Sequence, residues 1–145
     1  MYLRIKGIFV CVDATRKEEY LIDTHVLLWA LGSSDKIPEK IKEILINPQN
    51  EICISSVSLW EISIKVSVGK LKLNQSLSSF LDIVESGNFT IFGLETDYCK
   101  RQGDLPFIHK DPFDRNLIAT AICENCVMIT ADDNIRMYPI PVLWN

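Results

Sequence analysis

Short apolar runs alternate with helical patterns along this chain, and this alternation constrains its fold more than any other feature. The runs have the length and the β-branched content of buried strands, and helical spacing separates them. They cover residues 20–23, 51–55, 89–92 and 127–130, with an extended piece at 139–144. Strands that alternate with helices build a parallel sheet covered on both faces. The sequence therefore predicts an α/β domain with three layers, α/β/α, around a central parallel sheet.

Proline and glycine mark where the predicted helices begin and end. Pro38 opens one helix, while Gly32 and Gly69 close two others. Residues 70–73 fit either a small edge strand or an extended loop. Helices are expected around 26–30, at 38–46, 57–68, 78–85 and 95–102, and from Pro112 onward.

At 145 residues the chain suits one domain with a sizeable core. Residues 1–19 fit the alternating pattern poorly. They are interpreted as an N-terminal extension, either an extra strand and turn or a leader translated from an early start codon. The domain itself is assigned to residues 20–145.

The net charge of −4 argues against a generic nucleic-acid coat, which would usually be basic. It does not exclude a nuclease, because divalent metal in a carboxylate cluster changes the sign of the local field. The apolar run at 8–12 is too short to span a membrane. No membrane association is therefore expected.

The five cysteines are an odd number, and they indicate free thiols in a reducing, cytoplasmic protein. Cys123 and Cys126 form a lone C-x-x-C pair. A zinc site would need a second ligand pair, which the sequence does not offer.

Asp114 is the acid whose position is hardest to explain as a solvated residue. Leu117, Ile118 and Ala121 follow it at i+3, i+4 and i+7, which is the spacing of one buried helical stripe. A charge on such a stripe is costly unless cations or hydrogen bonds meet it. Asp111, just before Pro112, is the expected N-cap of the same helix.

Asp23 and Asp132 both follow predicted strands, and each has an alternative structural explanation. Asp23 can cap the next helix, and this reading and a site role remain equally open. Acids are also common in turns such as the one that holds Asp132. Asp132 is the preferred site residue, with Asp133 as its rival or its supporting acid. Because sites in parallel sheets form beyond the carboxyl ends of strands, both positions suit a site.

Glu61 lies three residues after Ser58, the spacing of a capping box, and taken alone this structural reading is favoured. Against it, apolar residues share the same helix face at i−4, i+3 and i+7: Val57, Ile64 and Val68. Lys65, at i+4, is positioned for a helix-surface ion pair with Glu61.

The four acids together carry the prediction of a site. Four unpaired carboxylates in one pocket would repel, since two unit charges about 4 Å apart interact by about 4 kcal/mol at an effective dielectric of 20. Divalent cations relieve this repulsion, and oxygen ligands favour Mg²⁺ or Mn²⁺. Asp23, Glu61, Asp114 and Asp132 are therefore the predicted metal ligands.

These residues resemble the motifs of PIN-domain ribonucleases, and in particular of the VapC-type toxins of bacterial toxin–antitoxin pairs. The resemblance extends from about Tyr20 to Trp144, and the extension before Tyr20 departs from it. It is carried by Leu21 to Trp29, Ile54-Ser55, Ser58 to Ile62, Gly69 to Leu71, Leu105-Pro106, His109, Asp111 to Arg115, and Ile129-Thr130-x-Asp132.

The resemblance implies a Mg²⁺- or Mn²⁺-dependent endoribonuclease, a hydrolase of RNA phosphodiester bonds. It assigns the metal and the catalysis to Asp23, Glu61, Asp114 and Asp132, and Thr130 would orient one of these carboxylates. It further implies a cognate antitoxin and a homodimer. Trp29 and Trp60 belong either to the core or to grooves for the antitoxin.

Other assignments follow from the residues themselves. Arg115 either contacts RNA phosphate or braces the acids, and Lys65 is a candidate substrate contact. His25 and His109 are interpreted as structural. Two alternatives to the nuclease are a PIN-fold binding module without catalysis and a doubly wound phosphatase-like domain. The phosphatase would need an acid at position 25, where His stands.

Overall fold

Five parallel strands form the central sheet, in the spatial order β5-β4-β3-β6-β7. The structure is a computed structural model, and it describes residues 2–5, 8–11 and 17–145. The strands are β3 (Glu19–Ile22), β4 (Glu51–Ser55), β5 (Thr90–Phe92), β6 (Val127–Ile129) and β7 (Val142–Leu143).

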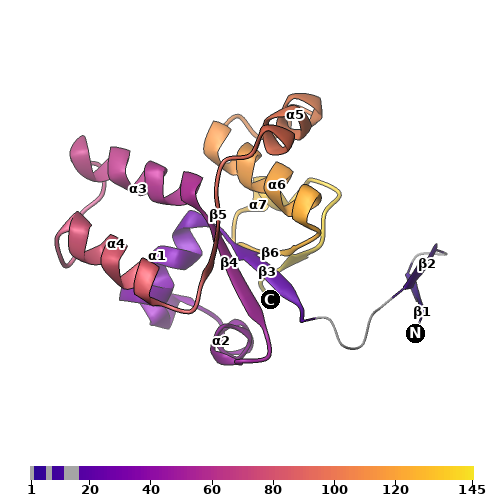
Figure 1. The fold of residues 1–145 in the computed structure, drawn as a ribbon, viewed down its shortest axis with the longest axis horizontal. Coiled ribbons are helices and arrows are strands. Elements are labelled where there is room, and N and C mark those ends of the chain that lie inside the picture. Colours follow the sequence, from indigo (N-terminus) through magenta and orange to yellow (C-terminus); the bar gives the residue numbers. More distant parts are fainter. Residues whose placement is uncertain (1, 6–7, 12–16) are drawn as a thin grey trace.

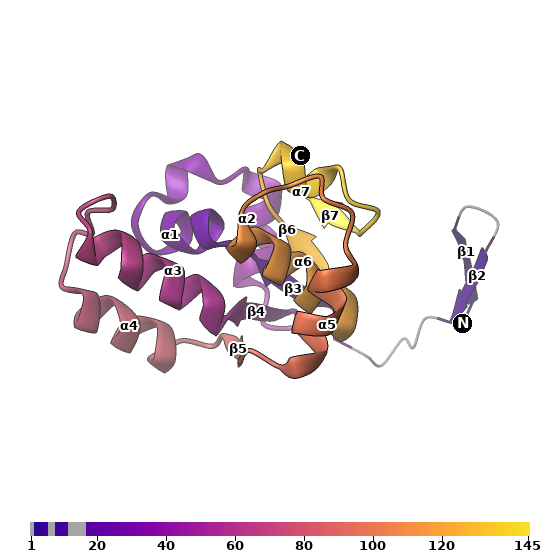
Figure 2. The same ribbon diagram turned by 90° about the horizontal axis from the view of Figure 1, so that it is seen from above.

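Helices cover both faces of this sheet (Figures 1 and 2). One layer contains α1 (Thr24–Gly32), α2 (Glu39–Ile46), α3 (Ser56–Ser67) and α4 (Leu77–Ser86), with the short 3₁₀ helix η1 (Ser34–Lys36). The other layer contains α5 (Thr96–Asp104), α6 (Pro112–Glu124) and α7 (Asp133–Arg136). The predicted three-layer α/β/α fold with a central parallel sheet is confirmed.

Neighbouring residues along the central strands point into different cores, as the two-residue period of a strand requires. Ile22 and Ile54 pack into the cluster with α1, α2, α3 and α4. Leu21 and Cys53 pack into the cluster with α6 and α7. Burial on both faces explains why these strands are almost entirely apolar in sequence.

The order of the strands reverses between β3 and β6, and we call the space beyond the carboxyl ends of these two strands the crevice. The chain leaves β3 toward β4 on one side, whereas β6 lies on the opposite side of β3 and leads outward to β7. Ligands of open parallel sheets bind beyond the carboxyl ends of the strands at such a reversal. Asp23 directly follows β3, and Thr130 directly follows β6.

The structure corrects some local predictions. β5, expected as a buried strand, is an edge strand with Ile91 39% exposed, because only β4 pairs with it. Residues 70–73 form a loop, which settles an alternative that the sequence left open. The short helices η1 and α7 were not predicted.

The N-terminal region contains a separate two-stranded antiparallel sheet of β1 (Tyr2–Ile5) and β2 (Ile8–Cys11). The side chain of Cys11 lies outside the described part, whereas Cys53, Cys99, Cys123 and Cys126 are free thiols, as expected. Among the described helices, none has the length and apolar character needed to cross a bilayer.

Candidate active site

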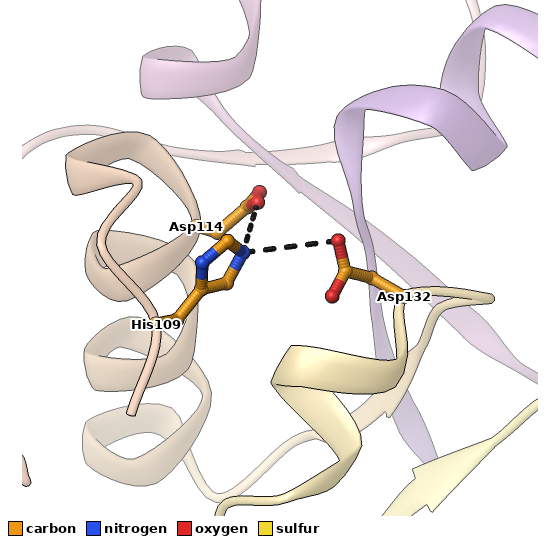
Figure 3. Close-up of side chains that lie close together, drawn as sticks. All are labelled: His109, Asp114 and Asp132. Atoms are coloured by element: carbon orange, nitrogen blue, oxygen red, sulfur yellow. Dashed lines mark hydrogen bonds and ion pairs between the residues drawn. The ribbon is translucent and has the colours of Figure 1, made fainter. Parts of the chain in front are cut away.

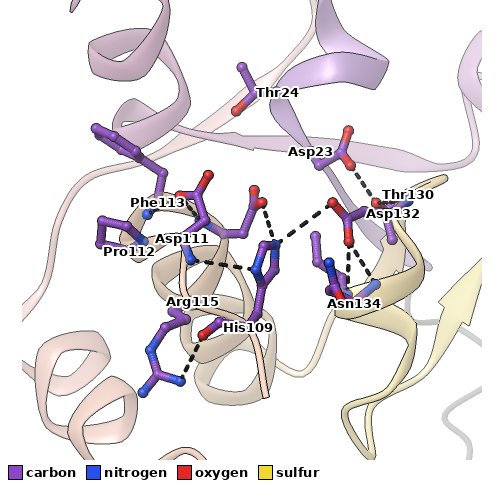
Figure 4. A network of polar contacts seen from close by, with 12 residues as sticks. Asp23, Thr24, His109, Asp111, Pro112, Phe113, Arg115, Thr130, Asp132 and Asn134 are labelled. Carbon is purple, nitrogen blue, oxygen red and sulfur yellow. Dashed lines mark hydrogen bonds and ion pairs between the residues drawn. The ribbon is translucent and has the colours of Figure 1, made fainter. Parts of the chain in front are cut away.

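Asp23 lies at the mouth of the β3–β6 crevice, and its carboxylate is held from two sides. Its Oδ1 accepts a hydrogen bond of 2.8 Å from the backbone N–H of Val26, so Asp23 is the N-cap of α1. Its Oδ2 accepts a hydrogen bond from the hydroxyl of Thr130, across the sheet (Figure 4). The predicted capping role and a place in the crevice therefore occur together, and Asp23 is only 3% exposed.

Glu61 is buried on α3, and its partners come from α1 and from the next turn of its own helix. Its Oε1 accepts a hydrogen bond of 2.7 Å from the Thr24 hydroxyl. Its Oε2 lies 2.6 Å from Lys65 Nζ. Thr24 is adjacent to Asp23 in the chain, so this bond ties Glu61 to the β3 side of the crevice.

The capping-box interpretation of Glu61 is wrong, because α3 starts earlier than that spacing implies. Ser55 is the N-cap, and Ser58 lies within the helix. The apolar stripe proposed around Glu61 also fails in part, since Ile64 and Val68 are 37% and 61% exposed. Burial of Glu61 instead depends on α1, which packs against α3.

Asp114 occupies the first turn of α6, where its neighbours at i+3, i+4 and i+7 are all buried, as predicted. Asp111 is the N-cap, and its Oδ1 accepts hydrogen bonds from the backbone of Phe113 and Asp114 at 2.8 and 3.3 Å. Asp114 Oδ2 lies 2.9 Å from His109 Nε2.

Asp132 is fixed by the short helix that begins after it. Its Oδ1 accepts hydrogen bonds from the backbone of Asn134 and Ile135 at 2.8 and 3.1 Å, so it is the N-cap of α7. Its own backbone N–H donates to the Thr130 hydroxyl at 3.0 Å. Oδ2 remains directed at the crevice, 3.7 Å from His109 Nε2.

His109 lies between Asp114 and Asp132, a place that its interpretation as a structural residue did not anticipate (Figure 3). Its Nδ1 lies 3.4 Å from the backbone N of Asp111, in a long hydrogen bond, so Nε2 is the ring nitrogen that faces the carboxylates. One donor atom from each of these three side chains lies within 4.8 Å of the others, close enough to hold one metal ion.

Burial, with nearby negative charge as a smaller cause, raises the pKa of two acids in the crevice. Burial raises the pKa of Asp23, although hydrogen bonds from Thr130 and Val26 oppose this effect. Burial, then the charge of Asp111, raises the pKa of Asp114 to about 7; Glu61 and Asp23 add to the rise and His109 opposes it. The structure thus brings the four predicted acids into one electrostatic cluster, together with Asp111.

Lys65 is the cation bound to this cluster from α3. Its hydrogen bond to Glu61 raises the pKa of the ammonium, and the charges of Asp111 and Asp114 contribute in the same direction. The predicted ion pair with Glu61 is present, and the Lys65 side chain is still 38% exposed. Within the described part of the chain, two basic side chains, Lys65 and His109, thus face five carboxylates.

Two predicted site residues point elsewhere. Arg115 is buried and donates to main-chain carbonyls in the last turn of α5 and in the loop before α6, with N···O distances of 3.1 Å to Gln102 and 3.1 Å to Pro106. Its guanidinium is therefore engaged with the protein and not presented to a phosphate, which corrects the expected substrate contact. The Asp133 side chain is 95% exposed and faces Arg136 at 3.8 Å, so it does not support the crevice acids.

His109 and Asp111 are the residues of the site that sequence reasoning missed. Both stand among the residues that carry the family resemblance, but His109 was interpreted as structural and Asp111 as a helix cap. Their position in the site could have been inferred from their spacing from Asp114. A helix N-terminus that buries one acid also brings the residues just before the helix to the same place.

A family model for the PIN domain matches residues 20–140, so the chain belongs to the PIN-domain family. A search of curated proteins gives no match. Among solved structures, the chain resembles VapBC2 from Rickettsia felis bound to a DNA fragment from their promoter, with a TM-score of 0.67 and 23% identity over 88% of this chain and 99% of that one.

Two further solved structures share the fold. DNA-bound VapBC from Salmonella typhimurium gives a TM-score of 0.63 and 19% identity over 87% of this chain and 97% of that one. VapC20 of Mycobacterium tuberculosis, a sarcin–ricin loop cleaving toxin, gives a TM-score of 0.62 and 11% identity over 87% of this chain and 99% of that one. At these identities the likeness establishes the fold, and function must be argued from the crevice itself.

Proposed function

We propose that this protein is a metal-dependent endoribonuclease that hydrolyses RNA phosphodiester bonds, and that it is the VapC-type toxin of a toxin–antitoxin pair. The observation that carries the proposal is the convergence of Asp23, Glu61, Asp114 and Asp132 on one crevice, where the described residues supply too few basic side chains to neutralise them. A nuclease also agrees with membership of the PIN-domain family.

The donor set fits a divalent cation. Carboxylate oxygens are the ligands that Mg²⁺ and Mn²⁺ prefer, and a bound cation would neutralise the carboxylates that lie beside the buried Asp114. Asp23, Asp114 and Asp132 would hold the principal ion, and Glu61 would bind a second ion or act through water. His109, with its nitrogen 2.9 Å from Asp114, is an additional candidate donor.

When bound, the ion supplies Lewis-acid polarisation of the scissile phosphate and lowers the pKa of a water nucleophile. The protein supplies the fixed carboxylates. Thr130 holds one oxygen of Asp23, the α7 N-terminus holds one oxygen of Asp132, and Lys65 with Thr24 holds both oxygens of Glu61. Preset ligands of this kind need little reorganisation during the reaction.

The proposed partners are RNA as substrate, a cognate antitoxin, and a second copy of the chain in a homodimer, in a cytoplasmic setting. The antitoxin proposal is supported by the fold shared with chains of VapBC complexes. Nothing in the crevice favours the phosphatase-like alternative. A PIN-fold module without catalysis is the alternative that a cleavage assay separates.

The test is cleavage of a mixed RNA pool in Mg²⁺, Mn²⁺ or EDTA by the wild type, Asp23→Asn, Asp114→Asn and the control Asp133→Asn. The control removes an exposed carboxylate next to Asp132. We expect metal-dependent cutting by the wild type and the control, and a loss of at least about a hundredfold in the other two, in line with removal of one electrostatic group.

Thermal unfolding of each variant would show that the fold is retained. Full metal-dependent activity of Asp114→Asn would contradict the assignment of the site. Absence of cutting in every metal, with Mg²⁺ still raising the melting temperature of the wild type, would favour the module without catalysis.

A further inference from the structure

A groove lined with lysines leads away from Glu61, between α1 and the loop that joins α3 to α4. Its volume is about 450 Å³. We call it the lysine groove, after the four residues that give it its charge: Lys36, Lys65, Lys70 and Lys72. Among the described residues that line it there is no Asp or Glu, although the chain as a whole has a net charge of −4.

The end of α3 directs two of these lysines into the groove. Gly69 adopts a positive φ of 76°, and the backbone N–H of Lys70 then returns to the Lys65 carbonyl at 2.8 Å. In the extended segment that follows, Leu71 and Leu73 pack against the core. Lys70 and Lys72 alternate with these leucines and are exposed.

The groove is continuous with the acid cluster. Lys65 and Thr24 line it, and both also bond to Glu61, at 2.6 and 2.7 Å. A phosphodiester chain with its scissile phosphate at the acids would therefore place its neighbouring phosphates among the lysines. A groove of one charge also concentrates a ligand of the opposite charge.

Aromatic side chains line the opposite wall. His25 and Trp29 have ring centroids 6.0 Å apart, and Trp29 is supported from behind by Trp144 at 5.7 Å. Basic grooves with aromatic platforms are the general means of holding single-stranded nucleic acid, because every base has a π-face. Unpaired bases are needed for such stacking, so a duplex would not use it.

We infer that the lysine groove binds the single-stranded RNA that flanks the scissile phosphate, with Lys70 and Lys72 on phosphates and His25 on a base. The inference rests on the proposed ribonuclease function. It gives the substrate a path that leads away from the metal ligands. Charge complementarity favours RNA over a protein segment as the occupant of this path.

The test measures binding without cleavage. A labelled, randomised, single-stranded RNA is titrated with the wild type in EDTA, at several salt concentrations, and anisotropy is recorded. The variants are Lys70→Gln/Lys72→Gln and the matched control Lys40→Gln/Lys100→Gln, whose lysines are exposed on α2 and α5 outside the groove.

We expect the groove pair to lower the slope of log K against log salt by about 1.4, or about 0.7 for each phosphate that the protein no longer neutralises. If the two proteins bind equally at about 1 M salt, this change in slope makes the variant bind roughly 25-fold more weakly than the wild type at about 0.1 M salt. The control pair should leave the slope unchanged. His25→Ala should weaken binding by a similar factor at every salt concentration, and His25→Phe should restore it.

Equal effects of the two lysine pairs, or no measurable binding of the RNA by the wild type, would overturn the inference. So would unchanged binding by the groove pair, and the groove would then be better explained as a site for a protein ligand. If the protein cleaves RNA but Lys70→Gln/Lys72→Gln does not change RNA binding, the ribonuclease function is retained and the groove inference is rejected. If RNA binding depends on the groove but no RNA is cleaved, the groove inference is retained and the ribonuclease function is rejected.

Discussion

The hydroxyl of Thr130 joins β6 to Asp23 at the end of β3, and it also receives the backbone N–H of Asp132. One buried side chain thus positions two acids that lie 109 residues apart in sequence, as the difference between positions 132 and 23 shows. Thr130 has no exposed surface, so its hydroxyl has no water to replace these partners.

Thr130→Val should therefore lower the free energy of unfolding by about 1–3 kcal/mol, the usual effect of leaving a buried polar partner unsatisfied. RNA cleavage should fall with it, because Asp23 loses the donor that orients Oδ2. Thr130→Ser keeps the hydroxyl and should retain most of both properties. Urea unfolding and cleavage assays on the three proteins would check this, and a Val variant equal to the wild type would remove Thr130 from the site.

The raised pKa of Asp114 predicts how stability depends on pH in the absence of metal. The folded pKa of about 7 exceeds the ordinary value of about 3.9, so the folded state binds this proton more tightly than the unfolded state. Its contribution to stability is fully present below pH about 4 and is lost as pH rises through about 7. The melting temperature in EDTA should fall across this range.

Asp114→Asn should flatten this fall and should be more stable than the wild type at a pH of about 8 in EDTA. Saturating Mg²⁺ should reverse the order, since only the wild type gains from binding the ion. Melting curves of both proteins at several pH values, with and without Mg²⁺, provide the measurement. Parallel curves for the two proteins would show that Asp114 is not the group responsible.

Arg115 predicts the behaviour of the loop before α6. Besides the carbonyls of Gln102 and Pro106, it donates to the hydroxyl of Tyr138 at 3.1 Å, and this hydroxyl accepts the backbone N–H of His109 at 3.0 Å. Arg115→Lys keeps the charge and loses the fork of donors. It should lower the free energy of unfolding by roughly 2 kcal/mol.

Amide hydrogen exchange should also become faster at residues 107–110 in Arg115→Lys. Arg136→Lys, which changes an exposed arginine, is the control and should leave both measurements unchanged. If exchange in the loop were the same in all three proteins, Arg115 would have no part in holding His109.

An apolar stripe along α3 and its C-cap gives a prediction about assembly. Trp60, Ile64 and Val68 are spaced by four residues and are 59%, 37% and 61% exposed. We expect this stripe to lie in the proposed homodimer, since a contiguous apolar surface of this kind typically marks an interface. Ile64→Glu/Val68→Glu should shift the protein to monomer in light scattering. Ile46→Glu, an equally apolar and more exposed position on α2, should not.

A homodimer that survives the double substitution would place the interface elsewhere. Trp60 is left in place in this design, because its ring packs edge-on against Phe113 at 5.4 Å, next to the acids.

Much of the fold could be predicted because the strands are buried on both faces and are therefore almost purely apolar. Residues 52–54 and 127–129 are clear examples. β5 was misjudged because an apolar run at the edge of a sheet looks the same in sequence as one at its centre. The short helix α7 depends on the capping of Asp132, which the sequence shows only as another acid in a turn.

The acids of the site and two of their partners, Thr130 and Lys65, were predicted, whereas Thr24 and His109 were not. Asp114 stood out because local spacing alone placed it on a buried stripe. Glu61 is held by Thr24, which is 37 residues away, and no local pattern encodes that contact. No local pattern encodes the positions of His109 and Arg115 either. His109, interpreted as structural, faces the acids, whereas Arg115, a candidate substrate contact, binds the loop before α6.

The candidate site draws on segments from almost the whole length of the domain. Asp23 and Glu61 are made early in synthesis, Asp114 much later, and Thr130 and Asp132 come with the strand that completes the crevice. A nascent chain on the ribosome therefore carries no assembled cluster until β6 has inserted beside β3. Shortened translation products that stop before β6 would be harmless to the cell's RNA, whatever the finished protein does to it.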